Sequence, residues 1–116
     1  SKTFEDLAQH MEPEICLHLL DVGLPPLSLA LPWMVSAFAD VFEPQDVLAI
    51  WDRVVGYDSL LPLAIVAVGI LRFRRARILK ADLPQDVRAA LSDISRLKPI
   101  VMMQELLCAL GRDLGV

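Results

Sequence analysis

The stretch of sequence that most restricts the fold is SLLPLAIVAVGILRFRRAR, which runs from Ser59 to Arg77. It carries no charge between Asp58 and Arg72 and then several arginines, which is also how a transmembrane helix meets its cytoplasmic flank. At about 1.5 Å per helical residue, however, the uncharged part spans roughly 20 Å, whereas the hydrocarbon core of a bilayer is about 30 Å thick. The run is therefore predicted to be a helix buried on nearly all sides at the centre of a helical domain.

Prolines and glycines divide the chain into helices. Pro62 suits the first turn of the long apolar helix, which is predicted to begin at Asp58 or Ser59 and to continue to about Ala81, and Gly69 would let a neighbouring helix approach closely. The other helices are predicted to begin at Thr3, Pro13, Pro32, Pro44, Pro84 and Pro99, with Gly23, Gly56 and Gly111 ending those from Pro13, Pro44 and Pro99. No alternating strand pattern is present in the sequence. The prediction is an all-α fold, an orthogonal lobe of about seven helices by this pattern, with residues 1–116 forming one domain or one lobe of a domain.

The composition indicates what such a domain would contact. Hydrophobic residues make up 55% of the chain, and its mean hydropathy is +0.51, which is more apolar surface than one small core needs. Either the fold is very compact, or one face normally lies against another part of a larger protein. A net charge of -4 argues against nucleic acid as a partner. The start at Ser1 without methionine suggests an excised fragment, and Cys16 and Cys108 are expected to be reduced core residues of an intracellular protein.

Catalytic motifs are not found in the sequence. There is no Gly-x-Ser-x-Gly turn, no glycine-rich phosphate loop and no His-Glu-x-x-His pair, and no cofactor is predicted. Cys16 and His18 could be a nucleophile and a base, but two residues apart on a helix they point about 200° apart. His10, Glu14 and His18 follow one another at i+4 spacing and could hold a metal on one face, although a solvated polar face explains the spacing better.

A basic segment follows the apolar run and consists of Arg72, Arg74, Arg75, Arg77 and Lys80. At about 100° per residue these side chains spread around most of the helix, so they do not form a narrow membrane-binding stripe. A solvated helix end, with the cations near the negative end of the helix dipole and within reach of Asp82 and Asp86, is the favoured interpretation. Contact with anionic lipid or with an acidic partner is the alternative.

The stretch PWMVSAFADVFEPQDVLAIWDRVVGYDSLLPLAIVAVGILRFRRARIL, residues 32–79, resembles the C-terminal half of the TBC domain, the fold of Rab GTPase-activating proteins. The residues that carry the resemblance, in order, are Trp33, Phe38, Phe42, Pro44, Trp51 and Asp52. Upstream, PEICLHLLDVGLPP is similar to the family's Pro-x-x-x-x-His-Leu segment. The resemblance implies an aromatic core made by Trp33, Phe38, Phe42 and Trp51 together with Asp52, and replacing Trp51 by alanine is then expected to cost about 3–5 kcal/mol.

The resemblance also implies what this stretch does not do. TBC proteins supply an arginine from an Ile-x-x-Asp-x-x-Arg motif and a glutamine from a Tyr-x-Gln motif, both in the N-terminal half of the domain. Neither motif occurs here: Arg53 follows the Trp-Asp pair, and the one tyrosine, Tyr57, precedes Asp58 and Ser59. Pro32 stands before Trp33 where the family usually has arginine, as in divergent members such as the ciliary Broad-minded type.

The expectation is a supporting lobe that is not an enzyme by itself, with a Rab-type GTPase as the partner of the complete domain. The expected location is the cytoplasm, at endomembranes or the cilium. The alternative is a non-catalytic module that binds another protein through its surplus apolar surface. A weaker alternative is attachment to a membrane surface through Arg72–Lys80.

Overall fold

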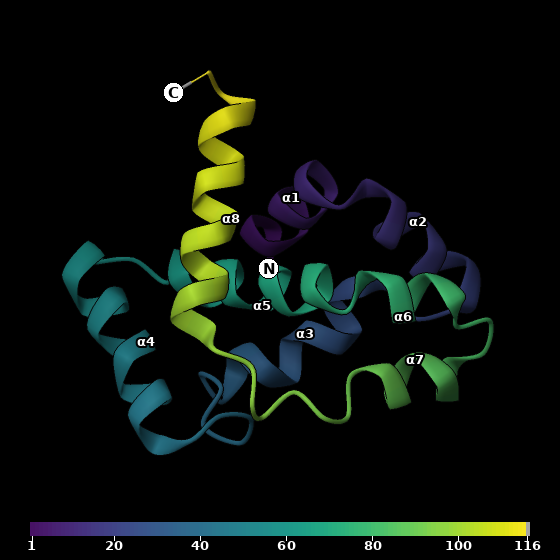
Figure 1. Ribbon diagram of the computed structural model, residues 1–116, viewed down its shortest axis with the longest axis horizontal. Coiled ribbons are helices and arrows are strands. Elements are labelled where there is room, and N and C mark those ends of the chain that lie inside the picture. Colours follow the sequence, from purple (N-terminus) through teal and green to yellow (C-terminus); the bar gives the residue numbers. More distant parts are fainter. Residues whose placement is uncertain (116) are drawn as a thin grey trace.

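The computed structural model describes residues 1–115, and within these residues the regular secondary structure is entirely helical, which confirms the all-α class (Figure 1). It divides them into eight helices rather than about seven: α1 (Lys2–Met11), α2 (Pro13–Val22), α3 (Pro26–Val35), α4 (Pro44–Tyr57), α5 (Leu61–Phe73), α6 (Arg75–Lys80), α7 (Pro84–Ala90) and α8 (Pro99–Asp113). Five of the eight begin with proline, whose fixed φ and missing N–H suit the first helical position, and α5 has Pro62 as its second residue.

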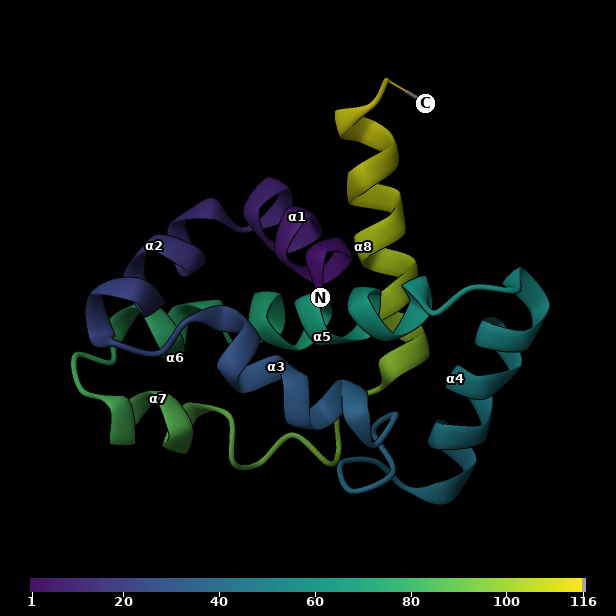
Figure 2. The same cartoon turned by 180° about the vertical axis from the view of Figure 1, so that it is seen from behind.

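Helix α5 is the centre of the fold. Every residue from Pro62 to Leu71 is buried, as the length and composition of the apolar run predict. Its neighbours are α1, α3, α4 and α8, which surround it on several sides. In Figures 1 and 2, α8 crosses α5 steeply and rises away from it, while α4 stands apart at one end of the molecule. The core is therefore built around one helix rather than between two layers.

A second group of helices continues from the far end of α5. Helix α2 runs beside α6, and α6 packs on α7 (Figure 2). The prediction of one helix from residue 58 to about residue 81 is wrong, because the chain breaks at Arg74, where φ is −97° and ψ is 13°. The Arg74 guanidinium bonds the carbonyl of Asp93, so a contact across 19 residues accompanies the break.

Other helix ends differ from the predictions by a few residues. Ser1 rather than Thr3 caps α1, with its Oγ accepting a hydrogen bond from the Phe4 N–H at 3.3 Å. Pro32 lies inside α3 instead of starting a helix, because Pro26 already occupies its first turn. Gly23 ends α2 with a φ of 90°, as predicted, a left-handed conformation that glycine adopts without strain.

Candidate functional site

The aromatic residues at the end of α3 and in the turn after it pack against the same core. Phe38 and Phe42 are buried, with ring centroids 5.7 Å apart, and Trp33 is partly buried against the same core. Ala37 and Phe38 have positive φ values of 49° and 63°, and the Phe38 N–H donates to the Trp33 carbonyl at 2.8 Å. This tight turn directs the chain from α3 toward α4. Three of the residues singled out in the sequence therefore lie together and fix the approach of α4.

Trp51 is not the core residue expected from the sequence. Its exposed fraction is 43%, whereas the preceding residue, Ile50, is fully buried. Helix α4 contacts α5 and α8 through the side that carries Ile50 and Val54, and Trp51 is rotated by about 100° from Ile50. Trp51 thus shares the outer side of the helix with Leu48 and Val55, which are also exposed. Helix α4 therefore has apolar side chains on a wider part of its surface than the other helices of this chain cover.

The two charged residues after Trp51 lie away from the core. Asp52 is exposed, which places its carboxylate in water rather than in the aromatic core. Arg53 is half-buried, and its guanidinium approaches the carbonyl of Ala49 on its own helix at 3.5 Å.

Most of the basic segment is used within the chain. Arg72 and Arg75 bond the two oxygens of the Glu12 carboxylate at 3.2 and 2.8 Å, and Arg75 also bonds Glu14. The hydrogen bonds that Arg75 donates to Glu12 and then to Glu14 raise the pKa of Arg75 above its ordinary value. Within residues 1–115, Arg77 and Lys80 make no ion pair, and the contacts expected with Asp82 and Asp86 are not formed. Arg72, Arg74 and Arg75 thus have partners within the chain, and a surface contact through the basic segment stays a prediction.

Glu12 explains why this pairing occurs. It precedes Pro13, and the residue before a proline is disfavoured in helical geometry, so α1 ends and α2 begins around it. Its side chain is only 7% exposed. The carboxylate reaches Arg72 and Arg75 on either side of the break at Arg74, so one partly buried ion cluster connects two helix breaks about sixty residues apart.

The histidines and Glu14 go to different partners, so the metal face considered from the sequence is not assembled. His18 Nε2 lies 2.7 Å from the carbonyl oxygen of Ala81, and Glu14 pairs with Arg75. The imidazole of His10 is 3.5 Å from Asp113 at the end of α8. Among residues 1–115 no three metal-binding side chains come together.

Cys16 is a structural cysteine rather than a nucleophile. It is buried, and burial, followed by the negative charge of Glu12, raises the pKa of its thiol above the ordinary value of 9.0. A nucleophilic cysteine needs the opposite change, because the thiolate is the reactive form. Cys108 is exposed, contrary to the expectation that both cysteines are core residues.

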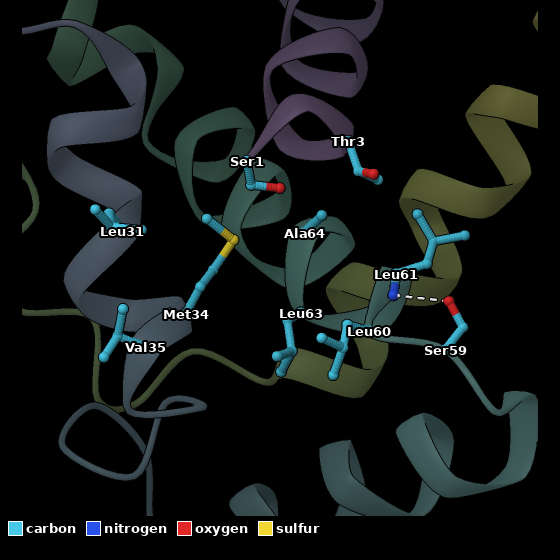
Figure 3. A pocket seen from close by; sticks show the side chains of 10 residues that line it. All are labelled: Ser1, Thr3, Leu31, Met34, Val35, Ser59, Leu60, Leu61, Leu63 and Ala64. Carbon is cyan, nitrogen blue, oxygen red and sulfur yellow. Dashed lines mark hydrogen bonds between the residues drawn. The ribbon is translucent and has the colours of Figure 1, made fainter.

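An apolar depression that the sequence did not single out lies on the surface of the described residues. It has a volume of about 510 Å³ and lies where the start of α1, the end of α3 and the start of α5 meet (Figure 3). We call it the Leu61 groove; its lining includes Ser1, Leu31, Val35, Leu60 and Leu61. No charged side chain lines it. The surplus of apolar residues was the only sign of it in the sequence.

Leu61 also lines two further depressions beside this groove. One, of about 350 Å³, reaches Tyr57 and Leu107, and the other, of about 400 Å³, reaches Leu110 and Leu114. The start of α5 is therefore the meeting point of a mainly apolar surface that extends over α1, α3, α4 and α8, with Asp6 and His10 lining its part over α1. Such a surface is typical of a docking face rather than of an enzyme active site.

The helices were also compared with the length that a bilayer requires. Among the described residues no single helix is long and apolar enough to cross a membrane, and α2 with α3 meets the length and composition test only as a pair bent by 103°.

Comparison with known proteins gives consistent results. The family model described as Rab-GTPase-TBC domain matches residues 1–79. Human TBC1 domain family member 19 is 35% identical over 106 residues, which is 91% of this chain and 20% of that protein. TBC domain-containing protein kinase-like proteins are 31% identical over 71 residues in Dictyostelium discoideum and 32% over 76 residues in human; these matches cover 61% and 66% of this chain but 7% and 8% of the relatives. The chain thus spans a fifth or less of these relatives, and no solved structure matches it.

Proposed function

Because this chain belongs to the Rab-GTPase-TBC domain family, we propose that it is the C-terminal half of such a domain, a supporting lobe that is not catalytic by itself. The observation that carries the proposal is that the family model and the human relative both cover most of the chain, while neither finger motif of the family occurs in it. A GTPase-activating protein needs a positioned arginine at the nucleotide, worth about 10³–10⁵ in rate.

The contacts of Arg53 support a non-catalytic role. It follows Trp51 and Asp52 and lies along its own helix, where its guanidinium approaches the Ala49 carbonyl. An arginine finger must instead project into a partner's active site. Arg72 and Arg75 are similarly occupied by Glu12 and Glu14. These three arginines thus all have partners within this chain.

The kinase-like names of two relatives do not imply that this chain has kinase activity. The matched region is 7–8% of each kinase-like relative, and the sequence holds no glycine-rich phosphate loop. The partner of the complete domain is a Rab-type GTPase, which would place the protein on the cytoplasmic side of an endomembrane.

Single-turnover GTP hydrolysis tests the proposal. A panel of GTP-loaded Rab proteins is mixed with a longer chain that contains these residues and the finger-bearing half, or with this chain alone at the same concentration. The expected result is acceleration of at least one Rab by the longer chain and none by residues 1–116. Acceleration by this chain alone would overturn the supporting role. No acceleration of any Rab by the longer chain would favour a non-catalytic protein-binding scaffold, for which the exposed apolar side chains at the start of α5 are the available surface.

A further inference from the structure

We propose that residues 72–98, which include α6, α7 and the segment leading to α8, form a surface that binds anionic lipid. We call these residues the basic end. The inference goes beyond Rab activation and does not depend on it, because the attraction acts between the chain's own cations and the lipid.

Charged residues are divided unevenly along the chain. The basic end holds eight arginine or lysine residues and three aspartates, a net charge of +5, whereas the rest of the chain has a net charge of -9. Glu12 and Glu14 pair with two of these arginines and lower the net charge of the basic end to +3. Charges at a protein surface interact over only about 8 Å at physiological ionic strength. The local excess of cations, rather than the total charge of the chain, therefore decides what this end attracts.

The remaining cations are on the surface and come from three parts of the chain. Within residues 1–115, five exposed cations of the basic end make no ion pair: Arg77, Lys80, Arg88, Arg96 and Lys98. Helix α6 packs on α7, and the bond from Arg74 to the carbonyl of Asp93 connects the start of α6 to the segment after α7. The cations thus lie over a face built from several elements, instead of along one stripe of a single helix.

Two exposed apolar side chains accompany these cations. Phe73, at the end of α5, and Leu83, in the turn between α6 and α7, are 61% and 51% exposed. The turn is held in place, because His18 Nε2 lies 2.7 Å from the Ala81 carbonyl oxygen and the Leu83 carbonyl accepts a hydrogen bond from the Val87 N–H at 3.2 Å. Figures 1 and 2 show this turn at the end of the molecule opposite α4, where it can meet a flat surface. Cations beside exposed apolar side chains are typical of proteins that bind at the membrane interface.

The arrangement suits a lipid surface better than an acidic protein. Arg77 and Lys80 line an open depression of about 270 Å³ between α6 and α7, and Asp86 lines it as well. An acidic protein presents carboxylates at fixed positions, which favours donors that are also fixed. An anionic leaflet presents many mobile headgroups, and these can gather around cations on separate elements. The basic end therefore responds to the charge density of the lipid rather than to one particular headgroup.

Vesicle co-sedimentation tests the inference. The longer chain of the hydrolysis assay is mixed with phosphatidylcholine vesicles, either pure or containing about one-third phosphatidylserine or phosphatidylglycerol, at low and high salt. The double variant Arg77→Gln/Lys80→Gln removes two cations from the basic end. Lys2→Gln/Arg112→Gln changes the net charge equally at two exposed residues outside it, and is the matched control.

A second pair of variants tests the apolar contact. Leu83→Ser removes the exposed leucine of the turn, and Val55→Ser on α4, where the valine is 75% exposed, is its control. None of the four variants removes a buried side chain, so each should keep the helical far-UV circular dichroism of the parent.

We expect the parent to bind both kinds of anionic vesicle equally and to be released by salt. Binding should be at least about tenfold weaker in Arg77→Gln/Lys80→Gln, since each cation near an anionic surface adds to the attraction. It should be about threefold weaker in Leu83→Ser and unchanged in the two controls.

Five results would overturn the inference. If the parent does not bind anionic vesicles, an acidic protein is the better partner for the basic end. Equal weakening by the two double variants would mean that only the net charge matters, and salt-insensitive binding to pure phosphatidylcholine would assign the contact to apolar surface elsewhere. A strong preference for one anionic headgroup would indicate a headgroup pocket. Salt-sensitive sedimentation without vesicles would assign the basic end to acidic residues of a second copy. The vesicles contain no GTPase, so each result is independent of the hydrolysis assay.

Discussion

Gly69 of α5 faces Met102 of α8 so closely that a Cβ added to the glycine would lie 3.3 Å from the Cβ of Met102. The methionine atom is next to its backbone, so α8 itself would have to shift to make room. Replacing glycine by alanine within a helix normally stabilises by about 0.5–1 kcal/mol. We expect Gly69→Ala to give no such gain, and Gly69→Val to lower the free energy of unfolding by about 1–3 kcal/mol through overpacking.

Gly56 is the matched control for that prediction. It lies in α4, and an added Cβ would meet no atom within 4 Å. Gly56→Ala should therefore raise the free energy of unfolding by about 0.5–1 kcal/mol. Urea unfolding of the three variants measures the difference. Equal gains for the two alanine variants would show that α5 and α8 are not in close contact at Gly69.

Ile50 and Trp51 are neighbours in α4 with different environments. Although tryptophan is the larger side chain, Ile50→Ala should lower the free energy of unfolding more than Trp51→Ala does. Ile50→Ala removes a fully buried side chain and is expected to cost about 2–5 kcal/mol. Trp51→Ala in this chain alone is expected to cost less than about 2 kcal/mol, because 43% of the tryptophan is already in water. Thermal unfolding of both variants decides the order, and a larger loss for Trp51→Ala would contradict the packing of α4.

Glu12 should contribute far more to stability than its neighbour Glu14. The Glu12 carboxylate is buried between Arg72 and Arg75, whereas Glu14 is 67% exposed. Glu12→Gln is expected to lower the free energy of unfolding by about 1–3 kcal/mol, less than a fully buried pair would, because both arginines reach solvent. Glu14→Gln should leave the urea midpoint nearly unchanged. Similar midpoints for both variants would mean that the ion cluster does not hold the two helix breaks together.

Cys16 should make the fold less stable in alkaline solution. Its pKa is raised in the folded state by burial and by the charge of Glu12, so the folded protein keeps the thiol proton at a pH where the unfolded chain has lost it. The stabilisation is fully present below the ordinary pKa of 9.0 and is lost as the pH rises through the folded-state value. Cys16→Ala should flatten the fall in unfolding free energy above pH 9, and Cys108→Ala should not.

Thiol titration of the native protein gives an independent measure. At pH 8 the exposed Cys108 should react quickly with a disulfide reagent, whereas Cys16 should react only as fast as the protein opens. Rapid reaction of both thiols without denaturant would contradict the buried position of Cys16.

The sequence predicts the centre of this fold well, because burial along α5 follows from local composition. The run from Pro62 to Leu71 has no polar side that could face water, so a helix made of it has to be covered all round. The helix end at Gly23 is also predictable from local sequence, because the left-handed conformation at a helix end favours glycine whatever residues lie nearby. Structural features that depend on the local sequence alone can thus be predicted from it.

Structural features that depend on residues far away in the chain could not be predicted from the sequence. The pattern continues through Arg74, and the break there coincides with the contacts of Arg72 and Arg75 with Glu12, sixty and more residues away in the chain. The resemblance to TBC domains predicts a buried Trp51, but the sequence does not say how much of the apolar side of α4 is covered by the rest of this chain. The Leu61 groove could be inferred only as an excess of apolar residues, since its walls come from three separate helices.

The central position of α5 has a consequence for synthesis. Helices α1, α3 and α4 all pack on α5, which begins at Leu61, after all three have been made. When synthesis has reached residue 57, α1, α3 and α4 have therefore been made while their common support is still to come. Nascent chains with such uncovered apolar faces are prone to aggregate or to recruit chaperones. Cooperative folding should begin only when α5 has left the exit tunnel, and it should be completed when α8 closes over α5.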